Sequence, residues 1–252
     1  MLKKWLASAG IGNAKVDTQL DNDQLIPGEE VSGKIVIEGG NAEQQVDQIN
    51  LFLMTEAARE IDDKKVYEKL KLETFTIGNS FTIGVGEKKE LDFDFTLPVH
   101  TPPTVGKTGV WIQTGMDVPN AVDPKDRDFI KVAPHQNMET ILEAFTSQLG
   151  FRLKSAEMEY SKRYRYVQEF EFLPGGEFRG DLDELEVMFF MHENRVDLVV
   201  QVDRRAKGLG GLFAEALEMD ESFVRVSFTD TEINQGVRSI ADKLRSAIRQ
   251  FS

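Results

Sequence analysis

The sequence of 252 residues contains no cysteine. This absence excludes disulfide bonds, thiolate catalysis, zinc sites with thiolate ligands and iron–sulfur clusters. Histidine is also scarce, and His100, His135 and His192 lie far apart without partners at the spacing of a metal site or catalytic triad. We expect them to be solvated or helix-capping side chains. The sequence therefore predicts no cofactor and no catalytic residue.

Long apolar runs are missing as well. The apolar stretches at 185–191 and 196–202 have the length of buried strands, far below the roughly 18 residues of a transmembrane helix. The N-terminal segment carries Lys3, Lys4 and Trp5, but its apolar core is too short for a signal peptide. These features predict a cytoplasmic protein.

Positive charge is in deficit. The chain has 30 Lys and Arg against 43 Asp and Glu, a formal net charge of −13. Nucleic acids and anionic membranes attract proteins through a basic face, so neither is expected to be the main partner. We predict no nucleic-acid binding and at most weak membrane association.

Short stretches of alternating apolar and polar residues fill the first half of the chain. The clearest runs from Leu91 to Leu97 and places Leu91, Phe93, Phe95 and Leu97 on one face. Six or seven such strands with turn residues between them predict an antiparallel β-sandwich over residues 1–133.

Helical spacing enters after residue 133. Residues 134–230 are predicted to form a second, mainly β domain with helices near 137–149 and 209–219, the first capped by Asn137 and ended by Gly150. Residues 231–252 are predicted to form one amphipathic helix. Thr229 and Glu232 have capping-box spacing, and Gly236 inside the helix costs about 1 kcal/mol relative to alanine.

Several segments resemble a known family when they are taken in order. They are LASAGIGNAKVDTQL, IPGEEVSGKIVIEGG, DFTLPVHTPPTVGKTGVWIQTGMDVPNAVDPKDRDFI, GFRL, QEFEF and FRGDLDELEVMF. The sequence resembles the arrestin-like proteins and, among them, closely resembles the bacterial sporulation-control protein M family. The resemblance implies a mainly β fold of two tandem arrestin-like antiparallel β-sandwich domains with helical insertions and a C-terminal amphipathic helix.

The same resemblance implies a function. It suggests a non-enzymatic regulator or scaffold in sporulation or stationary-phase control, with cytoplasmic regulatory or cell-division proteins as partners. Sheet edges, the joint between the domains and the C-terminal helix are the surfaces expected to bind them. Fold alone does not fix function, so this expectation depends on the resemblance.

An acidic cluster follows the strand that begins at Val110. Candidate polar residues at an interdomain joint are Asp117, Asp123, Asp126, Arg127 and Asp128. A solvated turn is the first alternative. A calcium or magnesium site is the second, although the cluster lacks the central glycine and closing glutamate of an EF-hand loop.

The C-terminal helix supplies the other candidates. The predicted partner-binding residues are Val237, Arg238, Ile240, Leu244, Arg245, Ile248, Arg249 and Phe251. The alternative is a helix docked permanently on its own domain. Two other functions stay open at this stage: a peripheral membrane adaptor using Trp5 and this helix, and a metal-dependent hydrolase using Asp123, Asp126 and Asp128.

Overall fold

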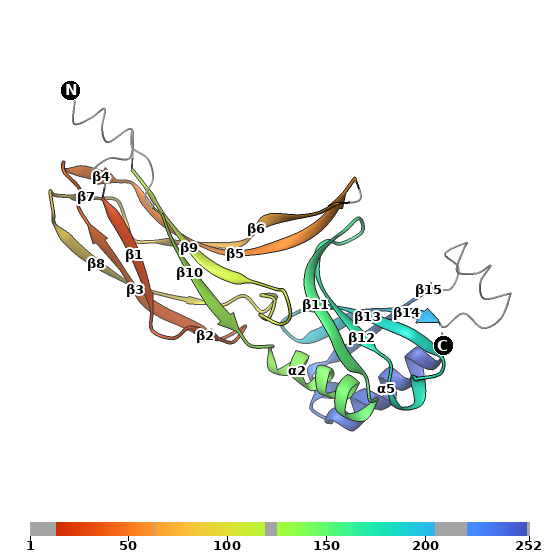
Figure 1. The fold of residues 1–252 in the computed structure, drawn as a ribbon. Helices are drawn as coiled ribbons and strands as arrows, with labels where there is room; N and C mark the ends of the chain where they lie inside the picture. Colours follow the sequence, from red (N-terminus) through yellow and green to blue (C-terminus); the bar gives the residue numbers. More distant parts are fainter. Residues whose placement is uncertain (1–13, 63, 119–124, 205–220, 251–252) are drawn as a thin grey trace. The chain divides into compact units, whose positions relative to one another are not determined.

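A computed structural model describes residues 14–62, 64–118, 125–204 and 221–250 (Figure 1). Contacts divide the chain into two compact units. Unit 1 comprises residues 1–56, 69–103 and 109–133, and unit 2 comprises residues 57–68, 104–108 and 134–252. The expected boundary at residue 133 places residues 57–68 and 104–108 in the first domain, whereas their contacts group them with unit 2. For residues 57–68 the reason is that strand patterns do not show which core the end of a long hairpin contacts.

Unit 1 is a β-sandwich. One sheet contains β1 (Lys15–Leu20), β3 (Glu30–Glu38) and β8 (Lys88–Thr96), all antiparallel. The other contains β5 (Gln48–Ile61), β6 (Lys64–Ile77), β9 (Val110–Asp117), β10 (Lys125–Val132) and the short β2 (Gln24–Leu25). Two further short strands, β4 (Gln44–Val46) and β7 (Phe81–Ile83), pair with each other.

The core of unit 1 lies between these sheets and follows the period-two pattern. Ile35 and Ile37 of β3 pack with Leu51 and Leu53 of β5 in one buried cluster. Phe93, Phe95 and Leu97 are buried, as the alternation predicted.

Unit 2 has a meander of antiparallel strands. It consists of β11 (Arg152–Ser161), β12 (Arg165–Leu173), β13 (Leu182–Met191), β14 (Arg195–Arg204) and β15 (Glu221–Thr229). The helices are α2 (Gln136–Glu143), the π-helix η1 (Ala144–Gln148), the 3-10 helix η2 (Gly176–Phe178), α4 (Asp230–Ile233) and α5 (Val237–Arg249). Figure 1 shows α2 and α5 along one face of these strands. The predicted mainly β class with helical insertions and a C-terminal helix is confirmed.

The core of unit 2 lies between the helices and this face of the sheet. Phe145 of η1 stacks on Phe172 of β12 with ring centroids 5.2 Å apart. Ile240, Leu244 and Ile248 of α5 are at most 1 % exposed and belong to the same cluster. Complete burial of such side chains stabilises a fold by about 1.5–3 kcal/mol each, so α5 is an integral layer of unit 2.

The N-cap of the first helix is His135 and not Asn137, so the cap predicted from the sequence is wrong. His135 Nδ1 accepts a hydrogen bond from the backbone N–H of Asn137 at 3.1 Å, so His135 is the N-cap. The Asn137 side chain instead donates to Asp230 Oδ1 at 2.8 Å. The capping role predicted for a histidine is confirmed at His135, and Gly150 has the left-handed φ of 76° expected after the helix.

The C-terminal segment differs from the single helix expected over 231–252. The capping box of Thr229 and Glu232 is present, but it starts the short α4. Gly236 has a φ of 96°, which an α-helix cannot contain, and it becomes the N-cap residue of α5. Glycine adopts this conformation at little cost, so the chain turns here without losing the burial of the apolar residues on α5.

Some expectations lie outside the described residues. They concern Trp5, Asp123, the helix near 209–219 and Phe251. Within the described ranges, none of the helices combines the length and apolar character that crossing a membrane requires.

Candidate functional site

The unit 2 sheet has a second face, opposite the helices. Because side chains alternate along each strand, this face collects every second residue of β11 to β15. We call it the open face; its members include Glu157, Glu159, Val167, Glu169, Glu171, Met188, Phe190, Asp197, Val199, Phe223, Arg225 and Ser227. One row across it runs by direct strand pairing from Glu157 through Glu169, Met188 and Val199 to Arg225.

The β11 end of this row is an ion-pair cluster around Glu157. Lys65 Nζ lies 2.8 Å from Glu157 Oε2, Tyr67 Oη donates to Glu157 Oε1 at 2.9 Å, and Lys107 Nζ lies 3.5 Å away. Glu157 is only 7 % exposed. Burial opposes its ionisation, but the hydrogen bonds from Lys65 and Tyr67 outweigh burial and hold the pKa of Glu157 below its usual value. The cluster attaches residues 57–68 to the sheet.

Glu169 is the next residue in the row, and its pKa is shifted in the opposite direction to that of Glu157. Burial raises the pKa of Glu169 to about 7, and the neighbouring carboxylates of Glu159 and Glu171 add to the increase. Met188 lies beside it on β13 and supplies an apolar neighbour. Glu169 therefore changes its protonation state near neutral pH.

The middle of the open face is an apolar island. Val167, Met188 and Val199 are 5–7 % exposed, and Tyr164 and Phe190 pack against them. The Tyr164 and Phe190 rings lie 5.0 Å apart at a tilt of 56°. The island is formed by three neighbouring strands, and Tyr164 reaches it from the turn between β11 and β12.

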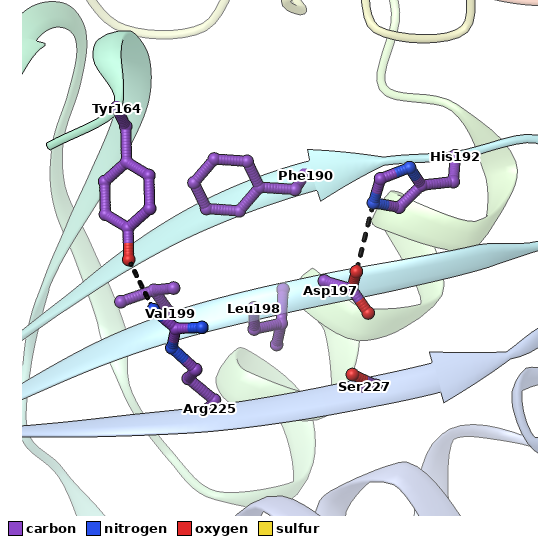
Figure 2. Close-up of a pocket in the computed structure, with 8 residues that line it drawn as sticks. All are labelled: Tyr164, Phe190, His192, Asp197, Leu198, Val199, Arg225 and Ser227. Atoms are coloured by element: carbon purple, nitrogen blue, oxygen red, sulfur yellow. Dashed lines mark hydrogen bonds and ion pairs between the residues drawn. The ribbon is translucent and has the colours of Figure 1, made fainter.

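A pocket of about 330 Å³ lies between the island and β15, and we call it the β15 pocket. Figure 2 shows its lining: Tyr164, Phe190, His192, Asp197, Leu198, Val199, Arg225 and Ser227. Tyr164 and Arg225 form one end, where Arg225 Nη2 donates to Tyr164 Oη at 3.3 Å. His192 and Asp197 form the other end, with Nε2 and Oδ2 3.0 Å apart. Phe190 lies between the two ends in this view.

The polar groups at the His192 end do not form a proton relay. Burial raises the pKa of Asp197, but hydrogen bonds from Ser227 and Arg195 more than reverse this and leave its pKa below the usual value. Asp197 therefore lies between Ser227 and His192. Nucleophilic catalysis by a serine needs the histidine in the middle, where it can take the hydroxyl proton.

Arg225 differs from the neighbouring cations in the kind of partner that its side chain contacts. Its guanidinium bonds to the neutral Tyr164 hydroxyl and, among the described residues, has no carboxylate within ion-pair distance. The neighbouring cations are satisfied, because Arg195 bonds to Asp197 and Lys243 bonds to Glu232. The guanidinium can therefore bind an added carboxylate in a forked geometry.

The described members of the predicted interdomain set lie on β9 and β10 of unit 1. Asp126 Oδ2 accepts a hydrogen bond from the Thr18 backbone at 2.8 Å. Burial and the charges of Asp126 and Asp17 raise the pKa of Asp128 to about 6. The structure therefore brings Asp126 and Asp128 together with Asp17, which the sequence did not suggest.

The other two described members of this set lie apart from the acid group. The Arg127 guanidinium lies over the Trp111 ring, 5.3 Å from its centroid. Asp117 ends β9, and its carbonyl accepts a hydrogen bond from the Asp47 N–H at 3.0 Å. An interdomain role for these residues stays a prediction. Among the described residues, no group of three or more His, Asp or Glu side chains has the arrangement of a metal site.

The predicted partner-binding residues of the C-terminal helix divide into two groups. Ile240, Leu244 and Ile248 are buried in the core, and Val237 packs against it. Arg245 and Arg249 both form ion pairs with Glu177, and Arg238 is exposed. The helix is docked on its own unit, so a partner can reach the buried group only if α5 detaches.

Comparison with known proteins identifies the family of this chain. A family model described as SpoOM protein matches residues 2–206. The chain belongs to the Spo0M family. It is 40% identical over 255 residues to the sporulation-control protein spo0M of Bacillus subtilis (strain 168), covering 99% of this chain and 98% of that protein. The crystal structure of Spo0M from Bacillus subtilis matches with a TM-score of 0.84 and 36% identity, covering 96% of this chain and 100% of that chain.

Membership of the Spo0M family confirms the resemblance inferred from the sequence. Sequence reasoning nevertheless missed the residues of the open face, among them Glu157, Glu169, Phe190 and Arg225. The signal was present in the alternation of SAEMEYS and QEFEF, which places glutamates on one face and apolar residues on the other. The alternation does not predict the register between neighbouring strands, which decides which of these residues lie side by side as far as β15.

Proposed function

We propose that this Spo0M-family protein is a non-enzymatic regulator in sporulation control that acts in the cytoplasm by binding a protein partner at the β15 pocket. The family relationship supports the regulatory role, since the 40% identical relative is a sporulation-control protein. The observation that carries the mechanism is the pocket itself, in which Tyr164 and Phe190 lie beside an arginine that has no carboxylate partner among the described residues.

The composition of the pocket favours a protein partner over a reaction. Tyrosine and arginine are enriched among the residues that dominate binding energy at protein interfaces, especially beside an apolar surface that excludes water. The island of Val167, Met188 and Val199 supplies such a surface. The polar groups nearby are arranged around Asp197 and lack the order of a catalytic relay.

A replacement experiment tests the proposal. The gene for this chain is placed in a Bacillus subtilis strain that lacks its own spo0M, and heat-resistant spores are counted beside an empty-vector strain. We expect the wild-type chain to restore sporulation and Arg225→Glu to lose most of the restoration, because reversing the charge repels a carboxylate on the partner.

Arg152→Glu is the matched control. Arg152 is an exposed arginine of the same unit that does not line the pocket, so the charge change is the same. Circular dichroism of both purified variants establishes that they fold. Equal spore counts for Arg225→Glu and Arg152→Glu would contradict the proposed site, and no restoration by the wild-type chain would contradict the regulatory role.

A further inference from the structure

Among the described residues, strand β15 is the edge strand of the unit 2 sheet. In the described part of the chain its strand partner is β14 on one side, and none lies on the other. Lys243 Nζ donates to the Ser227 carbonyl at 2.7 Å, which shows that this carbonyl points away from β14. In an antiparallel pair the N–H and C=O of a residue point to the same side and alternate along the strand. Phe223, Arg225 and Ser227 therefore present their backbone groups outward.

Most of these outward backbone groups are unpaired within the described part of the chain. Apart from the Ser227 carbonyl, none of them hydrogen-bonds to another described residue. An unpaired edge of this kind is a template for another strand unless it is blocked by a proline, a bulge or covering chain. β15 contains no proline, and its register with β14 runs without a shift from Glu221 to Thr229.

A groove follows the same edge on the helix side. It has a volume of about 470 Å³, and it is lined by Phe223 to Ser227 on β15 and by Lys243, Ser246, Ala247 and Gln250 at the α5 side. The β15 pocket flanks the edge on the open face, where it includes Arg225 and Ser227. A strand added at β15 would direct alternate side chains towards these two hollows.

The side chains of β15 define the chemistry of such a strand. Phe223 is 55% exposed, although large apolar side chains are usually covered. Arg225 lies two residues further along the same face, and its described polar partner is the neutral hydroxyl of Tyr164. A matching strand would carry an apolar side chain opposite Phe223 and a carboxylate opposite Arg225, since directly opposed side chains interact across a sheet.

We propose that the edge of β15 binds an extended segment of a partner protein by strand addition, and that this segment carries an acidic and a large apolar residue two positions apart. The inference rests on the proposed function and specifies the partner's chemistry. Backbone hydrogen bonds to Phe223, Arg225 and the Ser227 N–H provide affinity, and the carboxylate bound by Arg225 provides selectivity. The small side chain of Ala247 leaves space on the helix side for the residue between them.

The test uses the full chain and synthetic peptides in fluorescence anisotropy. The probe is an acetylated peptide of about nine residues, a typical strand length, with glutamate and phenylalanine two positions apart among valines and threonines. A control peptide of the same composition separates them by three positions, which places them on opposite faces. We expect at least about tenfold tighter binding of the probe than of the control peptide, and about tenfold loss with Arg225→Glu but not with Arg152→Glu.

Backbone pairing is tested independently of the side chains. Two versions of the probe are N-methylated at alternate amides, one at the odd positions and one at the even positions. Only one set faces the edge of β15, so we expect one version to bind and the other to fail. Equal binding of both versions, or no preference for the two-position spacing, overturns strand addition.

The remaining outcomes separate this inference from the proposed function. If the probe does not bind while Arg225→Glu still abolishes sporulation, strand addition is wrong and the protein-binding function stands. If the probe binds as expected and Arg225→Glu sporulates normally, the edge binds such segments and the proposed function is wrong. If sedimentation shows a dimer that Phe223→Lys dissociates and the probe does not, a second copy occupies the edge and the inference is overturned.

Discussion

Lys65 and Glu157 are 92 positions apart in the sequence, and the Lys65 Nζ lies 2.8 Å from the Glu157 Oε2. Lys65 belongs to the tip of the β5–β6 hairpin and Glu157 to β11, so the pair joins residues 57–68 to the rest of unit 2. A single strand pairing, between Ala58 and Glu159, supports the same connection. Side chains around Glu157 therefore carry much of this attachment.

Replacing Glu157 by Gln should weaken unit 2. The variant keeps the shape of the side chain but removes the charge that Lys65 and Lys107 face and that holds the pKa of Glu157 low. We expect a loss of about 1–2 kcal/mol in the free energy of unfolding at pH 7, discounted because Lys65 is partly exposed. Urea unfolding gives the change, and hydrogen exchange should show faster exchange at residues 57–68.

Glu60→Gln is the control for that measurement. Glu60 is an exposed carboxylate in the same hairpin that makes no ion pair among the described residues, so we expect a change below about 0.5 kcal/mol. Equal effects of the two substitutions would show that the Glu157 cluster does not stabilise the hairpin.

Glu169 should make stability fall as pH rises towards neutrality. Its pKa is raised to about 7 by burial and by Glu159 and Glu171, against a usual value near 4.5. Between these two values the folded state holds a proton that the unfolded state has lost, so its contribution to stability declines with increasing pH. After a discount for partial solvent access, the decline amounts to about 1–2 kcal/mol.

The variant Glu169→Gln removes this titration. We expect it to match the wild type near pH 4.5 and to unfold at higher urea concentration at pH 8, because glutamine does not ionise. Urea midpoints measured between pH 4.5 and pH 8 give the comparison. A variant less stable than the wild type at pH 8 would mean that the ionised carboxylate is stabilised in the folded protein.

Period-two alternation was sufficient to predict the class of fold and much of the core. It placed Phe93 and Phe95 on a buried face and identified 185–190 as a core strand, since burial of one face leaves a direct trace in the sequence. The same reasoning did not predict the break at Gly236. Helical spacing continues across this residue, but α4 ends at Ile233 and α5 begins at Val237, directly after Gly236 with its φ of 96°.

The open face could not be predicted for a physical reason. Alternation assigns Glu157, Glu169, Met188, Val199 and Arg225 to outward positions on their own strands, but their juxtaposition depends on the register of four separate pairings. Register is set by packing of the opposite face and by turn geometry. The candidate acids Asp126 and Asp128 were found because they are close in sequence, whereas Asp17 joins them only through packing of β1 on β10.

Neutralising Asp128 should change the stability of unit 1, where its carboxylate lies with those of Asp17 and Asp126. The pKa of Asp128 is raised to about 6 by burial and by the charges of Asp126 and Asp17. Its contribution to stability therefore declines as pH rises from about 4 to 6. We expect Asp128→Asn to be at least as stable as the wild type at pH 7.5, with a gain below about 1 kcal/mol because the side chain is partly exposed. Thermal midpoints at pH 4.5 and 7.5 measure this.

The exposed Asp94 on β8 provides the comparison for Asp128. Asp94→Asn changes the net charge of the chain by the same amount, so a purely global charge effect would shift both variants equally. A marked loss of stability in Asp128→Asn at pH 7.5 would indicate that its ionised carboxylate binds a group that favours the charge.

Leu244 tests whether α5 is a permanent layer of unit 2 or a detachable element. Its side chain is fully buried among Phe145, Ile240 and other residues of the core. Leu244→Ala should cost about 3 kcal/mol of unfolding free energy, through lost burial and a residual cavity. Ser246→Ala, on the exposed side of the same helix, should change stability by less than about 0.5 kcal/mol. Urea unfolding compares the two variants. A loss below about 1 kcal/mol for Leu244→Ala would mean that α5 spends much of its time off the core, where Ile240, Leu244 and Ile248 could meet a partner.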